Sequence, residues 1–485
     1  MLGIRLGEPA FGRPADSAAA THPSDSLAAK IVFWGMLVLL AWAPLPFASN
    51  RPWSWSLLSL VIGALLIVWS LAALRQPALM RLSWRRCTGA MILFLLAALW
   101  AFFQTLAVAP EALHAPLWQQ ASRLLDRPLT GSLSADPAAG RDGLMRLAAY
   151  GGMFWLAAQF GREPAYARRI LCCVAVVGTL YALYGIFVYS TGNKWILWYE
   201  RWAYGGDLTS TFVSRSAFGA FAGMALLSAL ALLLRPGNQN AGSRQSWRGA
   251  ITTYLDSLPP AFYGLVMACL ILATALMLSH SRGAVAVTAM GLAVMLAGLV
   301  LRTRNRRRYW LFALCIIVAT GAAITEFSGR ITLGRALQLA DHGTGREAIH
   351  DLTQRGIDDA PVTGRGLGSF PQLYFQYRDL TIPWGSPRYD KAHSTYLELI
   401  LELGYVGFGL LMAALCLIIL RLFTGVLRRR RNAVYPAWGL GMTALVATHA
   451  ILDFSIQIPA IAMTYAAILG VAFAQSWPTD QPGSV

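Results

Sequence analysis

The chain has 485 residues, of which 56% are hydrophobic and only 13% are charged, whereas soluble domains carry about 25% charged residues. Lys and Arg outnumber Asp and Glu by 40 to 23, which gives a formal net charge of +17. Apolar runs of about 20 residues recur along the chain, and each is long enough to cross the hydrocarbon core of a bilayer. These features exclude an ordinary soluble enzyme and predict an all-α, polytopic integral membrane protein.

About twelve transmembrane helices are expected, in a single membrane domain over residues 31–475. Residues 1–30 are polar and contain Ala and Pro, which predicts a flexible cytoplasmic tail, and the first apolar run lacks the character of a cleavable signal. A second cytoplasmic tail covers residues 476–485. In chain order, the spans are expected near residues 31–48, 56–74, 89–108, 144–160, 170–190, 216–234, 260–280, 283–301, 309–326, 395–420, 434–453 and 459–475.

The basic residues predict the orientation, because loops rich in Lys and Arg stay on the cytoplasmic side. When both termini and the short loops are placed on one side, that side carries the whole net charge of +17. The densest clusters, at 302–308 and 428–431, are short and directly follow span ends. They therefore indicate topology and contact with lipid headgroups rather than nucleic-acid binding. Both termini are expected in the cytoplasm.

Cofactor chemistry has no visible basis in the sequence. None of the six cysteines lies in a predicted outer loop, so no disulfide framework is indicated. No metal-ligand spacing and no Walker A motif occurs. We therefore expect neither a metal nor a nucleotide cofactor.

The outer loops are longer than the inner ones. Three stand out, at residues 109–143, 191–215 and 327–394, and the last is the longest. Its length exceeds that of a usual structureless connection, so we expect it to be partly helical and functional. Thr344 and Glu347 fit a capping box at the start of a helix. Asp358-Asp359-Ala360-Pro361 should end it, since the residue before a proline is displaced from the helical region. The apolar stripe between these two signals comprises Ile349, Leu352 and Ile357.

A glycine-rich turn follows this helix, over residues 364–370 (GRGLGSF). Glycine permits positive φ and lets a ligand approach the backbone closely. Arg365 lies inside the turn and is a candidate substrate-binding residue.

Three arginines at outer positions are candidates for binding an anion, because guanidinium holds phosphate in a bidentate fork and keeps its charge. Arg282 lies between two apolar spans, Arg346 in the first turn of the predicted loop helix, and Arg215 at the start of a span. A helix N-terminus adds its free N–H groups and the positive end of its dipole. The alternative for Arg282 and Arg215 is an interfacial anchor, and for Arg346 a solvated loop residue.

His393 lies where the longest outer loop meets a membrane span. A histidine side chain exchanges a proton near neutral pH, so His393 suits a general base that activates a hydroxyl; the alternative is a packing residue. Glu398 and Glu402 follow on one face of the same helix. Inside an apolar span they must face protein or water, either as substrate ligands or paired with an arginine.

His449 and Asp453 form a second polar group on the outer side. Four residues apart, they share a helix face and are close enough to hydrogen-bond. The pair either orients catalytic side chains or only satisfies two buried polar groups, and both residues are candidates for substrate binding.

Four segments together make the chain resemble the O-antigen ligase and Wzy-type polysaccharide polymerase superfamily. The segment 278–284 (LSHSRGA) is similar to the family's S-x-S-R-G, and 392–407 (AHSTYLELILELGYVG) to its H-N-x-x-L-E…E-x-G-x-x-G. Gly345-Arg346, with 361–370 (PVTGRGLGSF), is similar to its Gly-Arg loop. Segments 211–218 and 449–460 resemble flanking segments of exopolysaccharide-cluster members. The likeness covers about residues 205–475 and departs from the family at Ser394, Ser214 and Ser216, where Asn is usual.

The resemblance implies transfer of a glycan from a polyprenyl-diphosphate-linked oligosaccharide to an acceptor hydroxyl. The reaction would occur at the periplasmic face of a bacterial inner membrane, without a metal and with inversion. It implies that His393 is the base, that Arg282 and Arg346 bind the diphosphate, and that Arg215 assists. The flanking segments favour an exopolysaccharide or O-antigen polymerase. An O-antigen ligase with a lipid A core acceptor stays open, and a lipid-linked glycan flippase is the alternative from another class.

Overall fold

The computed structural model describes residues 26–235, 260–301, 343–379, 389–429 and 432–478. Between 343 and 346 it describes the backbone but not the side chains. The expected span at 309–326 and most of the N-terminal tail lie outside these residues.

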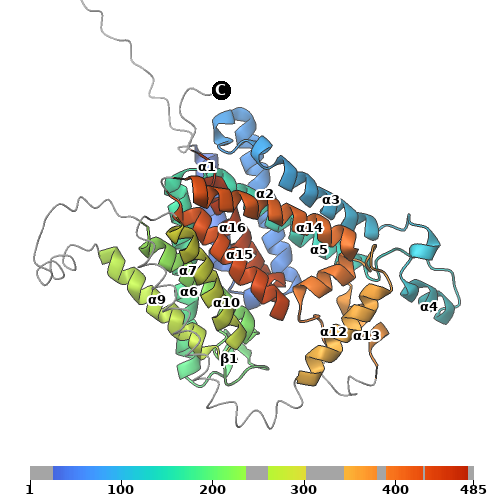
Figure 1. Ribbon diagram of the computed structural model, residues 1–485. Coiled ribbons are helices and arrows are strands. Elements are labelled where there is room, and N and C mark those ends of the chain that lie inside the picture. The colour runs from blue at the N-terminus through green and yellow to red at the C-terminus, as the bar shows by residue number, and fades with distance from the viewer. Residues whose placement is uncertain (1–25, 236–259, 302–342, 380–388, 430–431, 479–485) are drawn as a thin grey trace, which may run out of the picture.

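The described residues form helices joined by loops and one small β-hairpin (Figure 1). In the first half of the chain these are α1 (Leu27–Trp42), α2 (Pro52–Arg75), α3 (Thr88–Gln104), α4 (Pro116–Leu124), α5 (Pro137–Gly161), α6 (Pro164–Ser190), β1 (Trp195–Ile196) and β2 (Tyr199–Glu200). The second half contains α7 (Arg215–Leu233), α9 (Pro260–Leu278), α10 (Arg282–Val300), α12 (Gly343–Asp358), α13 (Phe370–Tyr377), α14 (Thr395–Arg428), α15 (Val434–Leu452) and α16 (Pro459–Gln475).

The predicted all-α membrane fold is confirmed in its main features. Within the described residues a helix lies at every expected span. Six of these helices are long and apolar enough to cross a membrane: α2, α6, α7, α9, α10 and α14. A bent pair of helical segments, Pro77–Arg86 and Thr88–Gln104 at 80°, adds a seventh if it is one span. The total of twelve spans stays a prediction.

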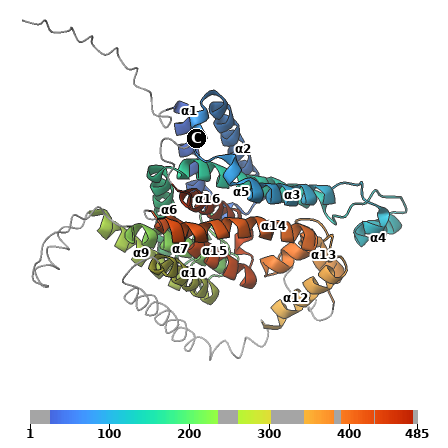
Figure 2. The same cartoon turned by 45° about the horizontal axis from the view of Figure 1, so that its top comes forward.

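α16 lies at the centre of the bundle, packed against α5, α15 and α6 (Figure 2). All of its residues from Pro459 to Gln475 are buried, which explains why it is apolar on every side. Small residues allow this close packing: a Cβ at Gly470 would lie 2.3 Å from the carbonyl oxygen of Phe154 on α5. α9 is the contrast, since only 17% of its apolar window is buried inside the protein.

The described part of the longest outer loop folds against the beginning of α14. α12 and α13 share a core with that helix, made of Ile349, Leu352, Ile357, Phe370, Leu373, Tyr374, Ala392 and Leu401. The predicted stripe and the predicted end at Asp358 are therefore confirmed. The expected cap is wrong, because α12 begins at Gly343 and Thr344 lies inside the helix. The two additional residues at this end cost little, since the first N–H groups of a helix have no intrahelical partner.

α14 is broken at Gly404, where φ is 65° and ψ is 176°. The chain 361–366 runs beside this break and bonds to it: the N–H of Gly366 donates to the carbonyl of Glu402 at 2.8 Å, and that of Tyr405 to Pro361 at 2.8 Å. Trp100 of α3 donates its ring N–H to the carbonyl of Leu403 at 2.8 Å. The break thus separates a short first segment of α14 from the long apolar remainder.

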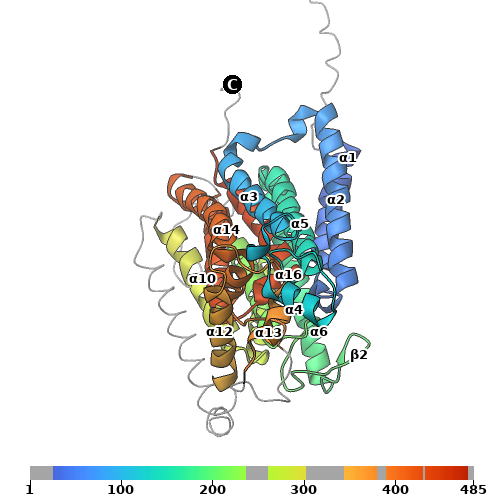
Figure 3. The same cartoon turned by 90° about the vertical axis from the view of Figure 1, so that its right-hand side faces the viewer.

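The β-hairpin, α12 and α13 all lie toward the lower end of the bundle as drawn in Figure 1 and Figure 3. They belong to the two segments, 191–215 and 327–394, that the charge pattern assigns to the outer side. The first segment of α14 lies at this same end, because it shares the core of α12 and α13.

Candidate functional site

His393 stands directly before α14, with its backbone in the left-handed region at φ 54°. Ser394 follows in extended conformation and Thr395 begins the helix. Nδ1 of His393 faces Oδ1 of Asp453 at 3.5 Å, an ion-pair distance longer than a good hydrogen bond. The rings of Tyr389 and Phe454 meet the imidazole edge-on, with centroids 5.8 and 5.3 Å away. The imidazole is therefore oriented by a carboxylate and two aromatic rings.

Asp453 ends α15 and joins it to the start of α14. Its Oδ1 accepts the N–H of Phe454 at 2.8 Å, and its backbone carbonyl accepts the hydroxyl of Thr395 at 3.2 Å. Asp453 is 5% exposed, so these contacts hold a buried carboxylate beside the imidazole of His393.

Glu398 fixes the residues immediately before His393. Its Oε2 accepts the backbone N–H of Ala392 at 2.8 Å and its Oε1 accepts Lys391 Nζ at 3.1 Å. Burial alone would lower the pKa of Lys391, but the carboxylates of Glu398 and Glu402 raise it above its ordinary value. The partner of Glu398 is thus a lysine and not the arginine considered from the sequence. Direct binding of substrate by Glu398 stays a prediction.

His449 and Asp453 remain close enough to interact electrostatically, but among the described residues no hydrogen bond joins their side chains, and Asp453 faces His393. α15 ends at Leu452 and Asp453 is extended (φ −162°, ψ 178°), so the helical spacing no longer applies at that position. His449 is 2% exposed. It lies near the start of α10, where a Cβ added to Gly283 would be 4.0 Å from its Nε2. His449 therefore links the His393 side of the site to the helix that begins with Arg282.

Arg215 and Arg282 are the first residues of α7 and α10, two helices that pack together. Ser214 caps α7 and Ser281 caps α10, each through its side-chain oxygen. The hydroxyls of Ser216 and Ser281 lie 3.2 Å apart and join the two helix starts. Arg282 is exposed, whereas the Arg215 side chain is 31% exposed. Two helix N-termini, each beginning with an arginine, are thus joined at one place, an arrangement suited to an anion.

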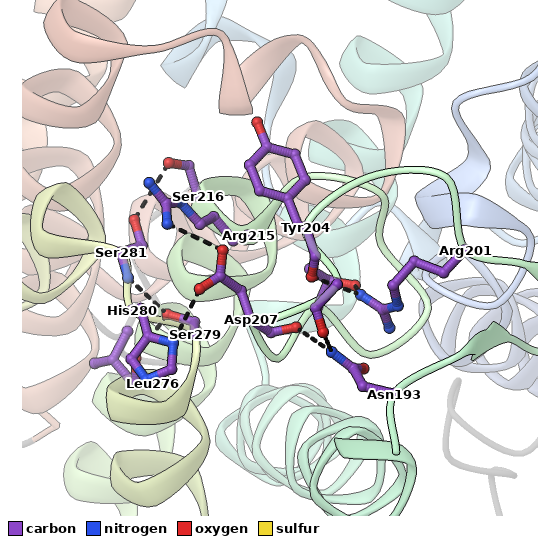
Figure 4. Close-up of polar contacts among 12 residues, drawn as sticks. Asn193, Arg201, Tyr204, Asp207, Arg215, Ser216, Leu276, Ser279, His280 and Ser281 are labelled. Carbon is purple, nitrogen blue, oxygen red and sulfur yellow. Dashed lines mark hydrogen bonds and ion pairs between the residues drawn. The ribbon is translucent and has the colours of Figure 1, made fainter. Parts of the chain in front are cut away.

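Asp207, in the loop before α7, holds the start of α7 and the turn before α10 together (Figure 4). Its Oδ2 accepts Arg215 Nη1 at 3.0 Å and its Oδ1 lies 2.9 Å from His280 Nδ1. Its backbone carbonyl accepts Asn193 Nδ2 at 2.9 Å. The guanidinium of Arg215 also lies over the ring of Tyr204, 5.6 Å from its centroid.

Residues 267–412 match the sequence model of the O-antigen ligase family. We call these residues the O-antigen ligase region, after the family to which they are similar. The match confirms the resemblance drawn from the sequence, and it covers α10, α12, α13 and the first part of α14. A search of the curated proteins found none that matches this chain.

The O-antigen ligase region contains Arg282, Arg346, Arg365, His393 and Glu398, while Arg215, His449 and Asp453 lie on its two flanks. The contacts between α7, α10, α15 and α14 nonetheless bring Arg215, His449 and Asp453 to the site. The side chain of Arg346 lies outside the described residues, although its backbone lies in the first turn of α12 as expected. Its role stays a prediction.

Arg365 belongs to a different network. It is 8% exposed, and its Nη2 donates to the carbonyl of Asp359 at 3.3 Å. Tyr377 donates its hydroxyl to the Asp359 carboxylate at 2.6 Å, and burial and that bond raise the pKa of Tyr377 to about 12. The backbone of Arg365 is bonded to Leu401. These contacts secure the loop against α14, and a substrate-binding role for Arg365 stays a prediction.

Three polar residues of the site were not identified from the sequence: Asp207, His280 and Lys391. Asp207 contacts His280, which lies 73 residues later in the sequence, and a contact between such distant residues produces no recognisable spacing. The available signal was an acidic residue in an outer loop that precedes Arg215 by eight positions. For Lys391, the available signal was its position two residues before His393, close in sequence to Glu398, an acidic residue in an apolar span that requires a cationic partner.

Proposed function

We propose that this protein transfers a glycan from a polyprenyl-diphosphate carrier to an acceptor hydroxyl, at the periplasmic face of a bacterial inner membrane. The observation that carries the proposal is the contact of His393 with Asp453 at the same end of the bundle as the paired helix starts of Arg215 and Arg282. The match to the O-antigen ligase family supports it. The orientation, with both termini in the cytoplasm, rests on the charge of the loops.

The geometry around His393 supports the role of a general base. Nδ1 of His393 faces Asp453, which leaves Nε2 to take the proton of the acceptor hydroxyl. The Asp453 carboxylate stabilises the imidazolium that results, and it fixes the ring orientation.

The acceptor oxygen forms a bond to the anomeric carbon while the bond from that carbon to the diphosphate breaks. The electron pair leaves with the diphosphate, and the arginines stabilise the charge that develops there. Arg282 and Arg346 bind the diphosphate, with Arg215 beside Arg282. Attack without a covalent enzyme intermediate inverts the anomeric carbon.

Polymerase and ligase differ only in the acceptor. A second lipid-linked repeat as acceptor makes the protein an exopolysaccharide or O-antigen polymerase, which the segments at 211–218 and 449–460 favour. A lipid A core sugar as acceptor makes it a ligase, the activity in the description of the matching family. The chemistry at His393 is the same in both.

The test is reconstitution of the purified protein in liposomes with a defined polyprenyl-diphosphate oligosaccharide. Longer lipid-linked glycan without further additions identifies a polymerase, and glycan on added lipid A core identifies a ligase. Movement of intact donor across the membrane, with no new glycosidic bond under either condition, would replace the proposal with a flippase.

A further inference from the structure

His280 and His393 stand in closely similar local structures. Both have left-handed backbones, with φ 49° and 54°, a conformation uncommon outside glycine. Each is followed by a serine at the N-cap position and then by a helix, α10 after His280 and α14 after His393. Backbone in this region costs free energy and persists where the surrounding structure imposes it, often at functional sites.

Each histidine also faces one buried aspartate through Nδ1. The distance is 2.9 Å from His280 to Asp207 and 3.5 Å from His393 to Asp453, and the two aspartate side chains are 8% and 7% exposed. Each imidazole meets an aromatic ring edge-on, Tyr189 for His280 and Phe454 for His393. The protein thus carries a second histidine–carboxylate pair, to which the proposed transfer step gives no role.

The position of this second pair indicates its ligand. Asp207 binds His280 and Arg215 with separate oxygens, so it holds both side chains at one place (Figure 4). Ser281 follows His280, caps α10, and contacts Ser216 at the start of α7. His280 is therefore joined to the paired helix starts that carry Arg215 and Arg282.

The free edge of the imidazole is available to that ligand. The His280 side chain is 23% exposed while Asp207 is almost fully buried, so the carboxylate occupies Nδ1 and the remaining edge faces outward. A charged imidazole donates from both nitrogens. With one N–H given to Asp207, the Nε2–H can donate to an anionic oxygen, and charge-assisted bonds of this kind are among the stronger ones in proteins.

We propose that His280 is a further cationic contact to the diphosphate of the lipid-linked donor, beside Arg215 and Arg282, and that Asp207 positions it. The proposal rests on the proposed function for the identity of the donor. It assigns binding and not proton transfer to His280, because the diphosphate leaves with the electron pair of the broken bond and needs no proton. Asp207 acts through His280 and Arg215 and touches no substrate.

The test separates binding from packing by the choice of variant. His280→Asn keeps a side-chain donor near the position of Nδ1 and tolerates positive φ, but it removes the outward N–H and the charge. His280→Ala removes both contacts. His114→Asn is the matched control, since His114 is another histidine of a predicted outer loop, bonded to the carbonyl of Ala109 at 2.9 Å.

The measurement is direct binding of farnesyl diphosphate to the full chain in nanodiscs, with farnesol as the uncharged comparison, after the melting temperature of each variant is checked. We expect His280→Asn to weaken diphosphate binding at least about tenfold, the effect of losing one charge-assisted hydrogen bond, and to leave farnesol binding unchanged. His114→Asn should bind like the wild type. No turnover is needed, so the result does not depend on the transfer reaction.

Asp207 is tested in a double-mutant cycle. Asp207→Asn should weaken diphosphate binding in the wild-type background and do so by a smaller factor when His280 is already Asn, because the two residues act as one unit. Two results would overturn the proposal: His280→Asn binds farnesyl diphosphate like the wild type, or only His280→Ala loses binding, which would show that His280 serves packing alone.

Discussion

The break in α14 should depend on the absence of a side chain at residue 404. Gly404 has a conformation that is essentially restricted to glycine, and a Cβ there would lie 2.1 Å from the carbonyl oxygen of Val362 and 2.7 Å from the N of Gly364. Gly404→Ala must therefore strain the backbone and push the 361–366 chain away from the helix.

The magnitude follows from what that movement disturbs. Backbone strain at such a residue costs about 1–3 kcal/mol. The displaced chain holds the break through the N–H groups of Arg365, Gly366 and Tyr405, and each bond lost adds about 1 kcal/mol. We expect Gly404→Ala to cost about 3 kcal/mol or more, and to impair transfer because the short segment after His393 is held by the same bonds.

The assay is thermal unfolding of the purified protein in detergent, followed by transfer activity. Gly409→Ala is the matched control: it lies in the same helix, a Cβ there meets nothing within 4 Å, and alanine is the better helix former by about 1 kcal/mol. Gly404→Ala should melt well below wild type and Gly409→Ala at or above it. Equal melting temperatures for Gly404→Ala and wild type would refute the reasoning.

Three further outcomes are expected. Glu398→Gln should lower the transfer rate at least about tenfold, equivalent to about 1.4 kcal/mol, because it loosens the residues before His393. Glu347→Gln, at an exposed position of α12, should leave the rate unchanged, and equal rates for the two variants would contradict the prediction. Asp453→Asn should lower the transfer rate but leave binding of farnesyl diphosphate unchanged, because Asp453 faces His393, the proposed base; a wild-type transfer rate would contradict this. Ser281→Ala should lower the free energy of unfolding by about 1 kcal/mol, because α10 loses its N-cap, and should weaken binding of farnesyl diphosphate. An unchanged free energy of unfolding would show that the cap does not stabilise the protein.

The parts of this structure that the sequence predicted are those governed by local periodicity. Apolar runs placed the helices, and the stripe Ile349, Leu352 and Ile357 ended where the Asp-Asp-Ala-Pro segment indicated. The motifs also identified His393 and Arg282 as polar residues at helix starts, which is where the structure has them.

The features that the sequence did not predict depend on contacts between distant segments or on where a helix ends. The run 395–420 reads as one helix, because the 361–366 chain that stabilises the break at Gly404 is far away in the sequence. The spacing of His449 and Asp453 predicted a pair on one helix face. The two residues do interact, but the helix ends between them, and the spacing gave no indication that Asp453 faces His393. Asp207 was missed since its two partners, Arg215 and His280, meet it only in the folded protein.

The central claim is that His393 is the base for a glycan transfer, and His393→Asn tests it most directly, because asparagine also tolerates the positive φ at this position. In liposomes with a polyprenyl-diphosphate oligosaccharide and acceptor, we expect the turnover of the variant to fall by about 10²–10⁴. Its melting temperature and its affinity for farnesyl diphosphate should stay close to those of the wild type. Transfer at the wild-type rate by a folded His393→Asn protein would contradict the account.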